Sequence, residues 1–67
     1  METEFIGKRF KIKAKNGKEV VYEIFDYETV HNDAMIFCRN VKNNHSKMIK
    51  LREFFFRMKN GEIILIV

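Results

Sequence analysis

The feature that most restricts the fold of this chain is its C-terminal segment, Glu62–Val67. After Glu62 every residue is apolar and most are β-branched, so a strand formed here would be apolar on both faces. Such strands are typically covered on both faces by other elements. We therefore expect a sheet that is closed by this strand and by a helix directly before it.

The helix is predicted from a spacing of i, i+3, i+4 and i+7, which places apolar residues in one stripe along a helix. The stripe consists of Leu51, Phe54, Phe55 and Met58. Basic residues at 57 and 59 suit the negative end of the helix dipole. Gly61 follows, and it can adopt the left-handed conformation that ends a helix. The pattern predicts that the whole stripe faces the core.

A β-hairpin is predicted near the N-terminus. Apolar residues at 10, 12 and 14 alternate with lysines, as in a strand with one buried face. The segment that follows contains Asn-Gly, a common turn sequence. A two-residue loop would place Phe10 opposite Glu23, whereas a three-residue loop, Lys15–Gly17, places it opposite Tyr22. We predict the second, with Gly17 left-handed, because it keeps the apolar face intact.

Further strands are predicted at residues 19–27, 34–42 and 47–50, with polar turns at 31–33 and 42–45. Four antiparallel strands, a short helix and a closing strand follow the order of an SH3-like barrel. We therefore predict a mostly β, five-stranded antiparallel barrel as one domain, residues 1–67. The alternative is an α+β domain, in which Ser46 caps a helix from Lys47 to Lys59 that packs on a small antiparallel sheet. Ile49 would then point to solvent, which argues against that alternative.

Composition bears on where the protein works. There is no signal-peptide pattern and no apolar run long enough to span a membrane, so we expect no membrane association. Cys38 is the only cysteine and cannot form an internal disulfide, which favours a reducing, cytoplasmic location. We also expect Cys38 to be buried. Residues with AT-rich codons dominate, which is typical of a low-GC bacterium or one of its phages.

No catalytic, metal or cofactor site is predicted. A nucleophilic cysteine needs an oriented base in contact, and a zinc site needs about four ligands, usually in close pairs. The residues of suitable type are not paired locally in the sequence; they are Cys38, His31, His45 and Asp33. The three glycines stand apart and form no phosphate-binding loop. We therefore expect a non-enzymatic binding module.

Charge is segmented along the chain, which has a net charge of +4. Residues 8–18 carry six basic groups and no acid, residues 19–33 carry five acids and no base, and residues 39–59 carry seven basic groups with Glu53 as the one acid. Adjacent strands of opposite charge can form pairs, so we expect the first basic block to be largely neutralised. The second basic block has no such partner in sequence.

The second block predicts a binding surface on the helix. With the stripe facing inward, Phe56 points roughly 140° away from it, at about 100° per residue. Arg52 and Lys59 lie four residues before and three after, so the three share one exposed face. An aromatic ring between cations suits base stacking with phosphate neutralisation. The candidate nucleic-acid-binding residues are Arg52, Phe56 and Lys59, with Lys42, Lys47 and Lys50 as electrostatic support.

Two alternatives remain for Phe56: packing under Phe5 and Ile6 of the N-terminal arm, or contact with a protein partner. Basic faces are often only solvated, and +4 is modest beside dedicated DNA-binding proteins. The leading hypothesis is a nucleic-acid-associated accessory or regulatory protein, carried by a phage or another mobile element. The alternative is a protein-interaction module, such as an inhibitor, an adaptor or a homodimer, with no nucleic-acid role.

Overall fold

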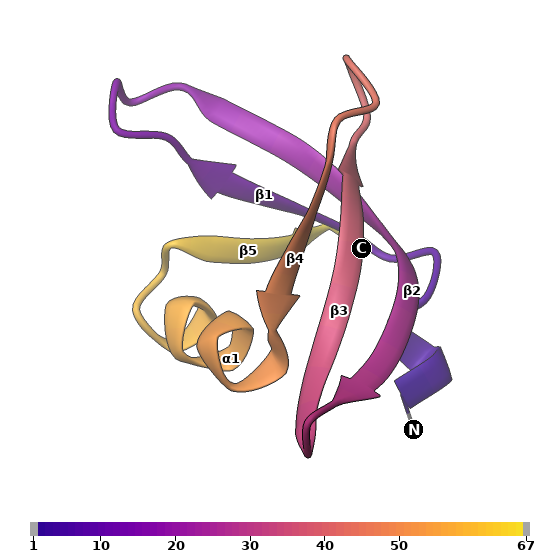
Figure 1. The fold of residues 1–67 in the computed structure, drawn as a ribbon. Coiled ribbons are helices and arrows are strands. Elements are labelled where there is room, and N and C mark those ends of the chain that lie inside the picture. The colour runs from indigo at the N-terminus through magenta and orange to yellow at the C-terminus, as the bar shows by residue number, and fades with distance from the viewer. Residues whose placement is uncertain (1, 67) are drawn as a thin grey trace.

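The computed structural model describes residues 2–66, which form one antiparallel sheet and a short α-helix (Figure 1). In chain order the elements are a 3-10 helix η1 (Glu2–Phe5), β1 (Arg9–Lys13), β2 (Glu19–Val30), β3 (Asp33–Asn40), β4 (Ser46–Lys50), α1 (Leu51–Lys59) and β5 (Ile63–Ile66). The mostly β class and the order of the strands and α-helix were predicted, whereas η1 was not. Val67, the last residue of the predicted closing strand, lies outside the described residues.

The strands pair in the order β4-β3-β2-β1-β5, and every neighbouring pair is antiparallel. β4 and β5 are therefore the two edges of the sheet, and no strand pairing joins them within residues 2–66. Instead, α1 contacts β3, β4 and β5, and Figure 1 shows it between the two edge strands. The sheet is open, so the closed barrel expected from the sequence is not confirmed.

The β1–β2 hairpin has the predicted register. Phe10 lies opposite Tyr22, as the three-residue loop requires. In the loop, the Gly17 N–H donates to the Ala14 carbonyl at 2.9 Å, and Gly17 has a φ of 84°. Because a positive φ disfavours residues with a Cβ, the loop depends on glycine at this position.

β2 is longer than predicted, and it bends. It continues to Val30, and a bulge at Phe25 interrupts its pairing with β3. Bulges of this kind increase the local bend and twist of a strand. His31 and Asn32 have φ values of 50° and 66° and form a two-residue turn of the type that suits hairpins. Asp33, which was predicted in this turn, is already paired within β3.

The alternative of a helix starting at Lys47 is wrong. Residues 46–50 form β4, in which Ile49 is buried opposite Ile36 of β3. α1 begins at Leu51 and has no side-chain hydrogen bond at its N-terminus. A helix through this segment would turn Ile49 to water, so burial of an isoleucine outweighs the local capping signal of Ser46.

The C-terminal end of α1 forms a Schellman motif around Gly61, which has a φ of 78°. The Gly61 N–H donates to the Met58 carbonyl at 3.1 Å, and the Glu62 N–H donates to the Arg57 carbonyl at 2.8 Å. These bonds satisfy carbonyls that the end of the helix would leave unpaired. Gly61 thus ends the helix and leads the chain into β5, as predicted.

The core lies between the sheet and α1, and each strand and the helix contributes to it. Its buried members are Phe10, Ile24, Ile36, Cys38, Ile49, Phe54 and Ile63. The rings of Phe54 and Phe10 meet edge to face, with centroids 5.1 Å apart. Such aromatic contacts are favourable beyond the area that they bury, so this pair anchors α1 on the sheet.

Two predictions about the C-terminal segment are wrong. Phe55 belongs to the predicted core stripe but is 47% exposed, whereas Phe54 is fully buried. On β5, Ile63 is buried but Ile64 is 50% exposed, so the strand is covered on one face only. Alternate residues of a strand point to opposite faces, and α1 packs on only one face of this sheet.

Cys38 is buried on β3, as predicted. Its Sγ lies 3.7 Å from the carbonyl oxygen of Lys47. Burial raises the pKa of the Cys38 thiol to about 11, although the nearby Lys47 ammonium acts in the opposite direction. The thiol is therefore protonated at neutral pH, and protonated thiols are poor nucleophiles.

Candidate nucleic-acid interface

One face of α1 carries an exposed aromatic ring between two cations. Phe56 is 62% exposed, and Arg52 and Lys59 are exposed as well. Phe54 is fully buried and lies about 160° around the helix axis from Phe56. Phe56 therefore points away from the core, and helical spacing places Arg52 and Lys59 on the same side.

The N-terminal arm packs on other residues of α1. The ring centroid of Phe5 lies 6.2 Å from that of Phe54 and 5.8 Å from that of Phe55. These edge-on contacts place Phe5 on the helix side that carries Phe54 and Phe55. The alternative in which the arm buries Phe56 is wrong, because most of the Phe56 side chain remains exposed.

The positive charge beside Phe56 is partly neutralised. Asp33, at the start of β3, has carboxylate oxygens 3.7 Å from the Arg52 guanidinium and 3.9 Å from the Lys50 ammonium. The second basic block has no adjacent acidic partner in sequence, but it gains one in space, because the β2–β3 turn brings Asp33 to the start of α1. Exposed pairs of this kind contribute at most about 1 kcal/mol each. A phosphate can therefore displace the Asp33 carboxylate from Arg52 or Lys50 at little cost in free energy.

Lys42 and Lys47 lie away from the helix face. The Nζ of Lys47 on β4 lies 5.3 Å from the centroid of the Tyr22 ring. Lys47 and Arg57 both line the cleft beside the β1–β2 hairpin that is described below. Arg57 lies about 100° around α1 from Phe56. Four of the six candidate residues thus gather at α1 and the residue before it, whereas Lys42 and Lys47 belong to other parts of the surface.

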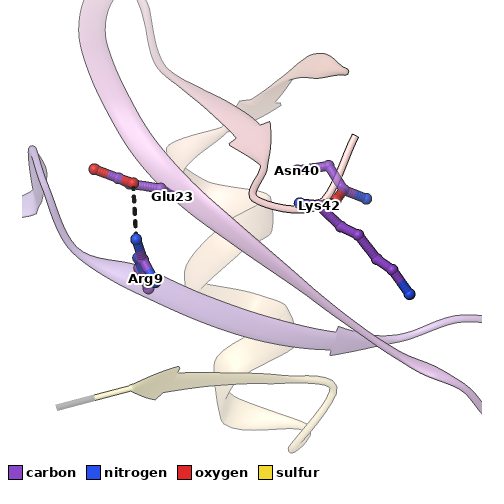
Figure 2. Close-up of polar contacts among 4 residues, drawn as sticks. All are labelled: Arg9, Glu23, Asn40 and Lys42. Carbon is purple, nitrogen blue, oxygen red and sulfur yellow. Dashed lines mark hydrogen bonds and ion pairs between the residues drawn. The ribbon is translucent and has the colours of Figure 1, made fainter. Parts of the chain in front are cut away.

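Lys42 projects from the loop between β3 and β4. The Oδ1 of Asn40 accepts hydrogen bonds from the backbone N–H groups of Lys42, at 2.8 Å, and Asn43, at 3.2 Å. Figure 2 shows Asn40 beside Lys42. Asparagine side chains commonly order turns in this way. The backbone of the loop is therefore held in place while the ammonium group of Lys42 is in solvent.

The first basic block is neutralised only in part. Arg9 pairs with Glu23 at 3.5 Å (Figure 2), and Lys11 pairs with Glu19 at 3.7 Å, as expected for cross-strand pairs. The described ion pairs do not include the lysines nearer to the loop, Lys13, Lys15 and Lys18. The sequence prediction did not single out these lysines. The signal for them was the lack of any acid between residues 8 and 18.

A cleft of about 350 Å³ lies between the β1–β2 hairpin, β4 and the C-terminal end of α1. We call it the hairpin cleft. Its basic lining residues are Lys13, Lys15, Lys47 and Arg57, and its carboxylate among the described residues is Glu62. Lys13 contributes backbone, because strand alternation turns its side chain to the face opposite Ile12. Half-buried side chains of Ile12, Val20 and Tyr22 also line it. The cleft therefore combines positive charge with an apolar surface.

The His, Cys, Asp and Glu side chains of the described residues form no cluster that could hold a metal ion. Within residues 2–66, no three His, Cys, Asp or Glu side chains lie close enough together to hold a metal ion. His31 and His45 are exposed next to or within turns, and Cys38 is buried on β3.

Among residues 2–66, no helix has the length and apolar character needed to cross a membrane. Comparison with protein-family models, curated proteins and solved structures found no significant match to this chain.

Proposed function

We propose that this chain is a non-enzymatic nucleic-acid-binding module, which contacts single strands through the exposed face of α1. The observation that carries the proposal is the position of Phe56, 62% exposed between Arg52 and Lys59. A base can stack on this ring while the cations neutralise the adjacent phosphates. Each such stacked base contributes about 1–3 kcal/mol to binding.

The proposed fold is an open form of an SH3-like barrel, in which α1 takes the place of pairing between β4 and β5. The strand order, the bulge that bends β2 and the contacts of α1 with both edge strands support this assignment. In such a fold, α1 is held at both edges of the sheet. Phe56 is then presented by a rigid element, which lowers the entropy lost on binding.

A cytoplasmic accessory or regulatory role, in a phage or another mobile element, completes the proposal. Cys38 has no second cysteine to pair with in this chain, which suits a reducing compartment, and the AT-rich composition suits such a genome. Binding should be modest and salt-dependent, because the helix face offers few phosphate contacts.

The test compares Phe56→Ala with Met48→Ala, which removes an exposed apolar side chain from β4. Binding of labelled oligothymidylate and oligouridylate is measured by fluorescence anisotropy at several salt concentrations. Phe56→Ala should weaken binding about 5- to 150-fold, through loss of one stacking contact, while Met48→Ala should bind like wild type. Arg52→Ala should lower the salt slope by about 0.7, the value for one phosphate of a single strand.

Two results would contradict the proposal. Equal weakening by Phe56→Ala and Met48→Ala would show that stacking on α1 is not involved. Undetectable binding of the wild-type protein at low salt would remove the nucleic-acid role altogether, and would leave the second candidate below.

The second candidate is a protein-interaction module, and the outer face of the sheet favours it. The rings of Phe25 and Phe37 have centroids 6.5 Å apart, and Met48 lies opposite Phe37 on β4. Phe25 and Met48 are both exposed, so they form an apolar patch suited to a protein partner or a second copy of the chain. Light scattering over a range of concentrations tests the homodimer, which Phe25→Ser should dissociate. A wild-type protein that stays monomeric would argue against self-association.

A further inference from the structure

The hairpin cleft is separate from the face of α1 that carries Phe56. Figure 1 shows the loop of the β1–β2 hairpin projecting away from α1. Ile12, Val20 and Tyr22 near this loop are only half-buried, and they line the cleft of about 350 Å³. The inner face of the sheet is thus accessible here.

Positive charge dominates the cleft. Lys15 and Lys47 line it, and the described ion pairs include neither of them. Arg57 also lines it but is paired with Glu53, with 2.9 Å between guanidinium nitrogen and carboxylate oxygen. Glu62 is the one carboxylate among the described lining residues. The cleft therefore attracts anions.

The fold positions the Lys47 ammonium and orders the backbone of the loop that carries Lys15. The Nζ of Lys47 lies 5.3 Å from the ring centroid of Tyr22, and that ring stacks on Phe10 with centroids 5.6 Å apart. Phe10 is fully buried, so the cation–π contact ties the Lys47 ammonium to the core. On the other side, the Oδ1 of Asn16 accepts a hydrogen bond from the Lys18 N–H at 3.0 Å, which orders the hairpin loop. Preorganised cations lose less entropy when a ligand binds.

We propose that the hairpin cleft binds one nucleotide of a single-stranded nucleic acid. Its phosphate contacts Lys15 and Lys47, and its sugar and base lie against Ile12 and Val20. This inference rests on the proposed function, because it takes the ligand of the cleft to be the same nucleic acid that stacks on Phe56.

The chemistry of the cleft matches a nucleotide better than simpler ligands. An inorganic anion would leave the apolar surface of the cleft without a partner, and an apolar ligand would displace water from the ammonium groups without replacing it. A nucleotide supplies both an anionic and an apolar part. The cleft volume of about 350 Å³ is near the lower end of the roughly 300–1,000 Å³ seen for ligand sites, which suits a single nucleotide unit.

The experiment compares two double variants that each remove two positive charges. Lys15→Gln/Lys47→Gln removes two cations of the cleft. The control, Lys8→Gln/Lys18→Gln, removes one lysine just before β1 and one that lines a cavity bounded by the β3–β4 loop. All four side chains are exposed, so both variants should melt close to the wild-type temperature.

The probe is a labelled oligothymidylate of about 12 nucleotides, within the size range of single-strand sites. Two phosphate contacts of a single strand contribute about 1.4 to the slope of log affinity against log salt concentration, so the cleft variant should lose a slope of that size. It should also bind about tenfold more weakly at low salt, whereas the control should lose clearly less on both measures.

The outcomes separate this inference from the proposed function. Wild-type binding that depends on Phe56, together with equal losses in the two double variants, would overturn the cleft site alone. Undetectable wild-type binding at low salt would overturn both. In a further arm, free thymidine monophosphate is titrated while backbone amide shifts are followed by NMR. If thymidine monophosphate shifts residues 12–15 and 47 as strongly as the oligonucleotide does, the cleft binds free nucleotides and the single-strand assignment is overturned. Weak shifts with the mononucleotide would support the single-strand assignment.

Discussion

Alanine substitution of the three consecutive phenylalanines in α1 should cause three different losses of stability. Phe54 is fully buried, with ring centroids 5.1 Å from Phe10 and 6.2 Å from Phe5. Phe55 is 47% exposed and contacts Phe5 at 5.8 Å. Phe56 is 62% exposed and appears in none of the described aromatic pairs.

The magnitudes follow from this difference in burial. Phe54→Ala should lower the free energy of unfolding by about 3–5 kcal/mol, as for other buried phenylalanines. Phe55→Ala should lower it by about 1 kcal/mol, from partial burial and the edge contact with Phe5. Phe56→Ala should stay within about 0.5 kcal/mol of wild type, since exposed residues contribute little and alanine favours a helix.

Urea denaturation followed by far-UV circular dichroism measures these losses. A domain of this length has a free energy of unfolding of only about 3–10 kcal/mol, so Phe54→Ala can fail to fold. Phe54→Leu then serves in its place, because it keeps an apolar side chain and should cost less. Equal m values across the variants would show that the change lies in stability and not in the denatured state.

One result would refute the reasoning. If Phe55→Ala or Phe56→Ala cost as much as the Phe54 substitution, α1 would be rotated about its axis by one or two residues, at about 100° each. The platform proposed for base stacking would then face the core, and the nucleic-acid proposal would lose its main support.

Two further predictions concern the hairpin loop and the buried thiol. Gly17→Ala should destabilise the protein by about 1 kcal/mol, because Gly17 has a φ of 84°, which disfavours a residue with a Cβ. The cost comes from the backbone alone, since no atom lies within 4 Å of the added Cβ. Gly17→Asn should cost less, as measured by thermal melting of the two variants and wild type, and equal stability of Gly17→Ala and wild type would contradict a left-handed glycine. Cys38 should react slowly with a thiol reagent in the folded protein and rapidly in denaturant, and equal rates would show that it is accessible. Its pKa rises from 9.0 to about 11 on burial, so the unfolded chain loses this proton first and stability should fall as pH rises through that interval. Cys38→Ala should not show the part of this loss of stability that comes from the thiol.

Features that depend on near neighbours in the chain could be predicted from the sequence. The three-residue loop at Lys15–Gly17 and the helix end at Gly61 follow from backbone conformations that glycine adopts easily. The alternation of residues 10, 12 and 14 with lysines indicated β1, because a strand repeats every two residues. These signals sufficed for the order of the strands and the helix.

Part of the candidate site could be predicted for the same reason. Phe56, Arg52 and Lys59 share a helix face by spacing alone, and all three are exposed in the structure. The pairing of Asp33 with Arg52 and Lys50 could not be predicted, because these residues meet only when the β2–β3 turn reaches the start of α1. The neighbours of Lys47 likewise depend on how β4 and β2 lie in the sheet.

The sequence by itself determined the loop and register of the first hairpin, its apolar face and the helix end at Gly61, since each depends on residues that are close along the chain. Only the tertiary structure decided that Phe54 and not Phe55 is buried, because the spacing admits both and the position of Phe10 selects one. It likewise decided that Ile64 is exposed and that the sheet stays open between β4 and β5. The physical reason is that burial and sheet closure depend on which surfaces meet in space, and hydrophobic packing has no directional preference that a pattern of apolar residues could reveal.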